Sequence, residues 1–268
     1  MLSSDTIRQL AQRLEEAEQE RKNIGLFSIE FPDITIEDAY AVQRAWFDIK
    51  LAAGRKLIGR KIGLTSKAMQ YATGIDEPDY GFLLDSMLFN DGAEIPEGHF
   101  IAPRIEVELA FILGKPLFGP NCTVFDVLEA TNYICPALEI LDNRLHRSDP
   151  ETKRGRTVKD TISDNASNAG IVLGGKPFKP SDPVDLRWVS ALCYRNSSLE
   201  ESGVAAAVLN NPVNGVAWLA NKLAPFGEVL QPGEIILSGS FVRPIEAYPG
   251  STIFADYGPL GTISCHFR

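Results

Sequence analysis

The pattern of apolar and polar residues changes at Lys56, and this change is the strongest constraint on the fold. Residues 4–53 read as helical, because apolar residues recur three or four positions apart and charged residues occupy the opposite face. From Lys56 onward, short β-type runs are broken by Gly, Pro and Asp. The sequence therefore predicts an α+β fold, with an N-terminal helical portion at residues 1–55 and a β-rich domain at residues 56–268.

Two helices have recognisable ends. In "TIEDAYAVQRAWFDIKLAAG", Thr35 is a candidate N-cap with Asp38 three residues on, and Gly54 is a candidate C-terminal stop. A later helix fits "NPVNGVAWLANKLAPFG", where Pro225 and Gly227 close it. The β-type runs include "KLIGRKIGLT", "RIEVELAFIL", "YICPALEIL", "AGIVLGG", "VDLRWVSALCYRN", "EIILSGSF" and "TISCHF".

The run "RIEVELAF" places two carboxylates side by side. In a strand, alternate side chains point to opposite faces, so Arg104, Glu106 and Glu108 share one face. Like charges two residues apart on one face repel each other. That face is therefore either open to water or bound to a cation.

A third glutamate lies in the run "CPALEILD". Glu139 has apolar neighbours on both strand faces, so its carboxylate is expected to be buried and to need a partner. Together with Glu106 and Glu108 it would supply three hard oxygen ligands, which suit Mg²⁺ or Mn²⁺. The alternative is that Glu106 and Glu108 lie on a solvated strand edge while Glu139 pairs with Arg104 or another arginine.

Lys61, in "LIGRKIGLT", is a candidate for proton transfer. It shares its strand face with Gly59 and Gly63, which leave space for a substrate to reach the ammonium group. Burial near a cleft would lower the pKa of Lys61 and suit it to proton transfer. The alternative is a surface lysine with no chemical role.

Two polar stretches are weaker candidates. "DEPDYGFLLDSM" surrounds a turn at Pro78 and reads equally well as a solvated loop. "DTISDNASNAG" offers hydroxyls, amides and backbone N–H groups to an anionic ligand, or no site at all. The nucleotide-binding, serine-hydrolase and zinc-protease motifs GxGxxG, GxxxxGK[ST], GxSxG and HExxH do not occur in the sequence.

Charge and composition narrow the partners and the compartment. The formal net charge is −9, which argues against nucleic acid and anionic membranes as partners. No apolar run approaches the roughly 20 residues that span a bilayer, and the polar start is unlike a signal peptide, so we expect a cytoplasmic protein. The four cysteines are far apart and the three histidines are unpaired, which excludes a disulfide framework and disfavours a zinc site.

Several motifs together resemble a known family. They are "ITIEDAYAVQ", "KIGLTSKAMQ", "EPDYGFLLDSM", "RIEVELAFIL", "PALEILDNR", "DTISDNASNAG" and "GVAWLANKLAP". They resemble the hydratase and decarboxylase family of meta-cleavage pathways, within the fumarylacetoacetate hydrolase superfamily. The resemblance runs over essentially the whole chain and implies a mixed β-roll, a catalytic role for the β-rich domain and a homo-oligomer.

The resemblance also implies a set of site residues. The E-x-E metal pair of the family falls on Glu106 and Glu108, and its third acidic ligand falls on Glu139. The lysine of the KIG motif, Lys61, is implied in proton transfer, and the aspartate of the PDYG motif, Asp79, in lining the same pocket. Further candidates, for substrate binding, are Ser163, Arg104 and Ser240, with Arg144 and Arg243 also able to bind a distal carboxylate.

The implied reaction is a metal-dependent hydration. We expect Mg²⁺ or Mn²⁺ as cofactor and a small-molecule 2-oxoalkenoate diacid from aromatic degradation, such as the homoprotocatechuate route, as substrate. A decarboxylase of the 4-oxalocrotonate type or a five-carbon 2-oxoalkenoate hydratase would use the same ligands. A C–C hydrolase would need a histidine, and all three histidines lie outside the motifs. The alternative that is not an enzyme is a catalytically silent, metal-dependent binding subunit.

Overall fold

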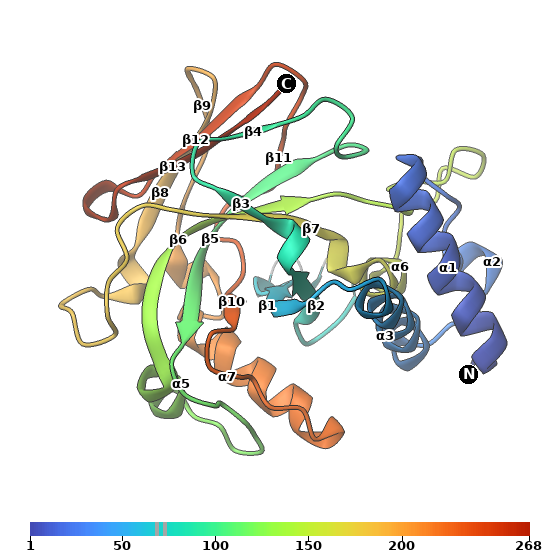
Figure 1. Cartoon of the computed structure of the whole chain (residues 1–268), viewed down its shortest axis with the longest axis horizontal. Coiled ribbons are helices and arrows are strands. Elements are labelled where there is room, and N and C mark those ends of the chain that lie inside the picture. Colours follow the sequence, from blue (N-terminus) through green and yellow to red (C-terminus); the bar gives the residue numbers. More distant parts are fainter. Residues whose placement is uncertain (68–69, 72–73) are drawn as a thin grey trace.

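A computed structural model describes residues 1–67, 70–71 and 74–268 of the chain. The N-terminal helices gather on one side of a β-rich body, and two later helices lie beneath its strands (Figure 1). The helices are α1 (Ser4–Glu20), α2 (Phe27–Glu30), α3 (Ile36–Ala52), α5 (Val124–Ala130), α6 (Val158–Ser163) and α7 (Pro212–Leu223). The strands are β1 (Leu57–Gly63), β2 (Asp79–Leu84), β3 (Leu88–Asn90), β4 (Ala93–Ile95), β5 (Arg104–Leu113), β6 (Thr131–Leu141), β7 (Asn168–Leu173), β8 (Ser190–Arg195), β9 (Ser198–Val204), β10 (Ile235–Leu237), β11 (Ile245–Glu246), β12 (Thr252–Asp256) and β13 (Thr262–Phe267).

The helical start of the chain is interrupted twice. Thr35 and Asp38 form a capping box at the start of α3, as predicted. Residues 4–53 are mainly helical, as predicted, but α1 ends where Arg21 adopts a left-handed conformation (φ 56°), and α2 is only a short turn before α3. α3 ends at Ala52, slightly before the predicted stop at Gly54. Leu10 and Leu14 of α1 and Trp46 of α3 share a buried apolar cluster, so the amphipathic pattern is satisfied by packing α1 on α3.

Two sheets make up the β-rich body. Among the described residues, the larger sheet has the strand order β2-β1-β10-β5-β6-β7-β3, with β11 also paired to β5, and the smaller has the order β4-β13-β12-β8-β9. β1 pairs in parallel with β10 and β3 with β7, while the other pairs in the larger sheet are antiparallel. The fold is therefore α+β with a curled mixed sheet, as predicted.

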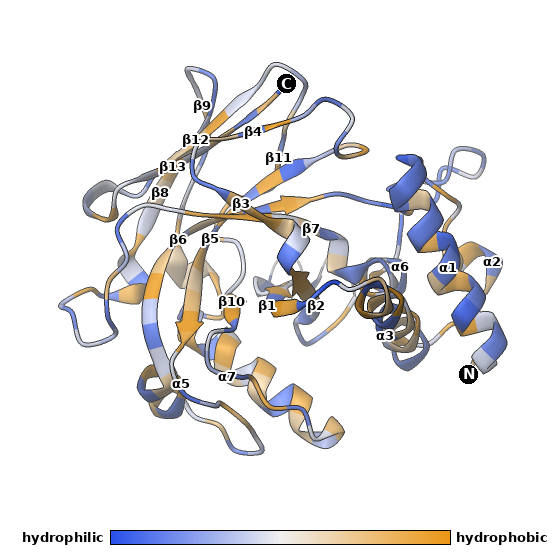
Figure 2. Cartoon of the chain, in the orientation of Figure 1, coloured by the Kyte–Doolittle hydropathy of each residue, from blue (hydrophilic) through white to orange (hydrophobic). Residues whose placement is uncertain are grey.

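The two faces of β5 have different surroundings. Ile105, Val107, Leu109 and Phe111 point into the main core, which also takes side chains from α7 and the smaller sheet. The hydroxyl of Tyr257, which follows β12, lies 2.8 Å from the carbonyl oxygens of both β5 and β6, at Glu108 and Ala137. The central strands are mainly hydrophobic, whereas α1 carries a broad hydrophilic face (Figure 2). The core thus packs against one face of β5, and Glu106 and Glu108 lie on the opposite face.

β2 differs from one reading of the sequence. The stretch around Pro78 was compatible with a solvated loop, but all six residues of β2 are buried and the strand pairs with β1 along its length. Gln43 of α3 donates to the carbonyl oxygens of Tyr80 and Ile162, which joins the N-terminal helices to β2 and α6. No helix of the described residues is long and apolar enough to cross a membrane. The division of the chain at residues 55 and 56 stays a prediction.

Candidate metal centre and active site

Three glutamates meet on the polar face of the larger sheet. β5 and β6 pair so that Glu106 lies opposite Glu139, while Glu108 lies next along the same face. Glu108 and Glu139 are fully buried, and one carboxylate oxygen from each of the three lies within 4.8 Å of the others. β5 lies between β10 and β6, so these glutamates do not lie on a solvated edge. That alternative interpretation is wrong.

Lys61 reaches the cluster from β1. Its Nζ lies 3.0 Å from Glu139 Oε1, and the residue is 3% exposed, so it is no surface lysine and no arginine pairs with Glu139 instead. A methyl group on Gly63 would lie 2.2 Å from Asp79 Oδ1 and 3.3 Å from Lys61 Nζ. The open side of Gly63 therefore gives both charged groups their room. Gly59 serves a different purpose, because a methyl group there would lie 1.9 Å from the Ile235 carbonyl oxygen of β10.

The pKa of Lys61 shifts in the direction opposite to the one predicted. Burial alone would lower the pKa of the ammonium group, as expected from the sequence. The charges of Glu139 and Asp79, with those of the other two glutamates, outweigh burial and raise this pKa above its usual value. In the metal-free protein Lys61 is therefore a firmly protonated group.

Asp79 lies at the start of β2, directly opposite Gly63. It is 1% exposed, and neither of its carboxylate oxygens has a hydrogen-bond partner in the described part of the chain. Burial, together with the charge of Glu139, raises the pKa of Asp79 to about 6, although Lys61 and Arg156 act in the opposite direction. Asp79 is therefore poised to gain or lose a proton near neutral pH.

The glutamates on β5 also hold protons more tightly than usual. Burial and the charge of Glu139 raise the pKa of Glu106 to about 7, and burial with both neighbouring glutamates raises that of Glu108 well above its usual value. With every carboxyl group ionised, four negative charges would surround the positive charge of Lys61, while among these carboxyl groups Arg104 and Arg156 act only on Glu106 and Asp79 respectively. The arrangement is electrostatically incomplete without a further cation.

The three glutamates fit a divalent metal ion. Octahedral Mg²⁺ with ligands at about 2.1 Å places neighbouring oxygens about 3 Å apart and opposite ones about 4.2 Å apart. The observed spread of up to 4.8 Å is close to that range and needs only small side-chain adjustments. Oε1 of Glu108 and Oε2 of Glu139 are buried without hydrogen-bond partners, so each has a lone pair available for a cation.

Two hydrogen bonds orient the buried glutamates. The amide of Asn168 donates to Glu139 Oε1 at 2.8 Å, and the backbone N–H of Gly239, just after β10, donates to Glu108 Oε2 at 2.8 Å. Each bond occupies one oxygen and leaves the other free. This is the usual role of residues that surround a metal site. Neither Asn168 nor Gly239 was singled out from the sequence, since an amide in a polar loop and a glycine after a strand have many ordinary uses.

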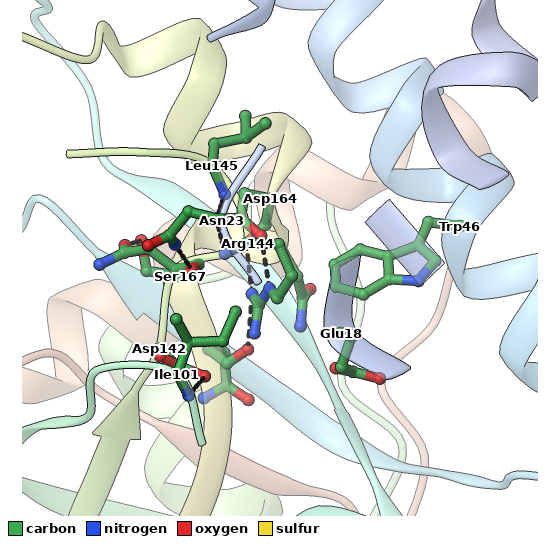
Figure 3. Close-up of polar contacts among 12 residues, drawn as sticks. Glu18, Asn23, Trp46, Ile101, Asp142, Arg144, Leu145, Asp164 and Ser167 are labelled. Atoms are coloured by element: carbon green, nitrogen blue, oxygen red, sulfur yellow. Dashed lines mark hydrogen bonds and ion pairs between the residues drawn. The ribbon is translucent and has the colours of Figure 1, made fainter. Parts of the chain in front are cut away.

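Arg144 holds the segment that carries Asn168 (Figure 3). Its Nε donates to Asp164 Oδ1 at 2.6 Å and its Nη2 to the Asn168 carbonyl oxygen at 3.1 Å, while its guanidinium lies 5.0 Å from the Trp46 ring. Between them, the turn η2 (Asn165–Ser167) has three consecutive residues in the left-handed region. Such a backbone persists only where its surroundings fix it firmly. Arg144 thus supports the site from outside and is not free to bind substrate.

The predicted substrate-binding residues occupy different surroundings. Ser163, at the end of α6, is fully buried, and its hydroxyl has no hydrogen-bond partner among the residues that the structure describes. Arg104 begins β5 on the face of the glutamates, and its Nε is buried without a partner. The hydroxyl of Ser240 is engaged by the backbone of Val107 and Val242. Arg243 is 85% exposed and pairs with Glu201, away from the described cluster.

Comparisons with known proteins bear directly on this site. No protein-family model matches the chain. The chain is 62% identical over 267 residues to the 2-oxo-hept-4-ene-1,7-dioate hydratase of Escherichia coli, with the alignment covering 100% of both proteins. The solved 4-oxalocrotonate decarboxylase from Pseudomonas putida G7, complexed with magnesium and adipate, is 35% identical, has a TM-score of 0.94 and covers 100% of this chain and 99% of its own.

A more distant structure shows only the fold. A fumarylacetoacetate hydrolase family protein from Yersinia pestis CO92 has a TM-score of 0.56 at 14% identity, covering 78% of this chain and 92% of its own. The β-rich body therefore has a fold of the fumarylacetoacetate hydrolase type. Within that fold, the chain belongs to the family of 2-oxoalkenoate hydratases and 4-oxalocrotonate decarboxylases.

The raised pKa values predict a pH-dependent stability of the metal-free protein. Glu106 has a pKa of about 7 in the folded state against an ordinary 4.5, so the folded protein binds more protons than the unfolded chain between these values. We expect the free energy of unfolding of the chelator-treated protein to fall as the pH rises through this window. Urea unfolding at a series of pH values measures it.

Glu106→Gln is the matched variant for this titration. Glutamine cannot ionise, so the decline should become shallower. Excess Mg²⁺ should stabilise the wild type more at the upper end of the window than at the lower, because it binds ionised carboxylates. A pH profile that is identical in the wild type and the variant would show that Glu106 has an ordinary pKa.

Proposed function

We propose that the chain hydrates 2-oxohept-4-ene-1,7-dioate through its 2-hydroxydienoate tautomer, giving 4-hydroxy-2-oxoheptanedioate. The observation that carries the proposal is the buried set of three glutamates with Lys61 inside it, in a chain 62% identical to a relative named for this hydratase activity. A 2-oxo acid offers two oxygens that a divalent metal can chelate. We also propose the degradation of homoprotocatechuate as the pathway.

In this proposal Glu106, Glu108 and Glu139 hold Mg²⁺ or Mn²⁺. The metal supplies Lewis-acid polarisation of the 2-oxo group and so favours the conjugated ketone over the dienol. Asn168 and Gly239 keep the buried carboxylates Glu139 and Glu108 in place through the hydrogen bonds described above. Their contribution is orientation, since each bonds the oxygen that the cation does not need.

Lys61 and Asp79 form the proton-transfer pair. Lys61 is the protonated member, and Asp79, with a pKa of about 6, is largely ionised at neutral pH. During ketonisation, Asp79 takes the proton of the 2-hydroxyl while Lys61 gives one to C5, and a proton then returns from Asp79 to Lys61. During hydration, the water oxygen bonds to C4, its proton passes to Asp79 and C3 receives a proton from Lys61, and the proton on Asp79 then returns to Lys61.

The rival reaction is decarboxylation. It would begin at the same metal, and the relative of solved structure is named a 4-oxalocrotonate decarboxylase. A five-carbon 2-oxoalkenoate hydratase would also use the same ligands. The identity to the seven-carbon hydratase favours hydration of a diacid. If the chain were a catalytically silent binding subunit, nothing would explain why Lys61 is buried among four carboxylates.

The resemblance implies a homo-oligomer and the polar start of the sequence favours the cytoplasm, and both remain part of the proposal. Trp188, Leu192 and Leu199 are exposed apolar side chains on or next to β8 and β9. An exposed apolar patch of this kind suits an interface between copies. The net charge of −9 supports the absence of nucleic acid and anionic membrane from the list of partners.

Identification of the product tests the proposed reaction. With Mg²⁺ present, we expect the seven-carbon dienol diacid to lose its ultraviolet absorbance and to give a product heavier by one water, as measured by mass spectrometry. The same protein should decarboxylate 4-oxalocrotonate slowly in comparison. Faster loss of CO₂ from 4-oxalocrotonate would assign the chain to the decarboxylases instead.

Lys61→Met tests the proton-transfer role. We expect kcat to fall by about 100-fold or more, the usual scale for a general acid or base. Affinity for Mn²⁺ should be unchanged or higher, because the variant removes a positive charge beside the glutamates. Lys115→Met, which removes an exposed lysine paired with Glu129, is the matched control and should keep its activity. Unchanged kcat in Lys61→Met would leave Lys61 with only a structural role.

A further inference from the structure

We propose that Arg104 and Arg156 together bind the distal carboxylate of the substrate, and so make the site select dicarboxylates over monocarboxylates of the same reactivity. This inference rests on the proposed function and deepens it. It assigns a role to Arg156, which the sequence did not single out, and pairs it with Arg104, one of several candidates there.

Arg104 lies on the same face of β5 as Glu106 and Glu108. It is the first residue of β5, two positions before Glu106, and therefore points to the same side of the sheet. Opposite it on β6 is Leu141, just as Glu139 is opposite Glu106. The arginine thus lies at the end of the row of glutamates. Its Nε is buried and donates to no atom of the described residues.

Arg156 approaches from the loop before α6. Its Nη1 donates to Asn143 Oδ1, whereas its Nε and Nη2 are buried without hydrogen-bond partners, and the side chain is only 14% exposed. Its charge acts on the pKa of Asp79 and on that of Arg104. Asn143 lies two residues beyond Leu141, the residue opposite Arg104, so Arg156 lies near the end of β6 that adjoins Arg104.

The carboxylate that lies within ion-pair distance of Arg156 neutralises it only weakly. The nearest carboxylate to Arg156 is Asp164, 3.6 Å from Nη2, but Asp164 is already bonded to Arg144 at 2.6 Å. Burial lowers the pKa of Arg156, because a low-dielectric environment disfavours the charged guanidinium. Two partly buried arginines, each with buried donors that have no hydrogen-bond partner in the described chain, are able to receive a carboxylate, which accepts two parallel hydrogen bonds from a guanidinium group.

The other arginines near this region are already occupied. Arg144 uses its donors on Asp164 and on backbone carbonyl oxygens, as Figure 3 shows. Arg147 pairs with Glu246 and also donates to the Ala102 carbonyl oxygen. Arg104 and Arg156 are thus the two arginines of this region with buried, unused donors in the described chain.

The spacing along β5 matches a seven-carbon diacid. Two residues of strand span about 6.6 Å, which separates the backbone positions of Arg104 and Glu106. An extended chain from the first to the seventh carbon spans roughly 7.5 Å, at about 1.25 Å per bond. A substrate whose 2-oxo acid end lies at the glutamates therefore places its far carboxylate beside the arginines. A five-carbon monoacid would leave this positive end without a partner.

The test compares two substrates in matched variants. We expect Arg156→Gln to lower kcat/KM for the seven-carbon dienol diacid by about 10- to 100-fold, the scale of lost hydrogen bonds to a charged group. For the five-carbon dienol monoacid, kcat/KM should stay within about threefold of the wild type. Arg104→Gln should behave in the same way. Arg154→Gln removes an exposed arginine from the same loop and should leave both substrates unaffected.

A binding measurement separates this inference from the proposed reaction. Calorimetry on the Mg²⁺-loaded protein should show that heptanedioate binds at least about tenfold more weakly to Arg156→Gln than to wild type or Arg154→Gln. If the wild type turns over neither dienol, the proposed function fails while this comparison still tests the arginines. Equal losses for both substrates, or unchanged heptanedioate affinity, would overturn the assignment.

Discussion

The repulsion among buried carboxylates is the constraint on which the rest of the site depends. Pairing of β5 with β6 forces Glu106 and Glu139 together, and β1 and β2 add Lys61 and Asp79. A fold does not keep such an arrangement for stability, because apolar residues would fill the same space at lower free energy. The surrounding scaffold accordingly holds the charges in place. The Tyr257 hydroxyl donates to backbone carbonyl oxygens of both β5 and β6. Asn168 and Gly239 each donate a hydrogen bond to one carboxylate oxygen of a buried glutamate.

The charges along this face divide into two ends of opposite sign. Glutamates and Asp79 make one end negative, and Arg104 with Arg156 makes the other positive. A metal ion at the first end and a carboxylate at the second would neutralise both. Such a site would be completed only when cofactor and a dicarboxylate are bound together, which links specificity to the same electrostatics as catalysis.

The local patterns of the sequence predicted the strands that carry the site. Alternation in "RIEVELAFIL" gives both the bounds of β5 and the shared face of Glu106 and Glu108, and the apolar neighbours of Glu139 predict its burial. The same patterns could not distinguish β2 from a loop, because a strand buried on both faces lacks alternation and its boundaries contain turn residues. The direction of the Lys61 pKa was wrong for a related reason. The pKa of Lys61 depends on four carboxylates from three other strands, and a local sequence pattern does not show how close they lie to Lys61.

Arg156 illustrates what sequence reasoning misses. It lies in "KRGR", which has the composition of a surface loop, and only the path of the chain between β6 and α6 buries it. The resemblance to a family identified the acidic ligands and the lysine, which recur in recognisable motifs. For the far end of the substrate, the sequence left Arg104 as one of several candidates and did not identify Arg156.

Equilibrium binding of Mn²⁺ tests the central claim most directly. Titration of the chelator-treated protein, with free Mn²⁺ measured by electron paramagnetic resonance, should show one saturable site per chain in the wild type. In Glu139→Gln the affinity should fall by about 100-fold or more, since loss of even a supporting residue typically weakens metal binding by 10- to 100-fold. Equal affinity in the two proteins, or no binding by the wild type, would contradict the conclusion that a metal ion holds these carboxylates together.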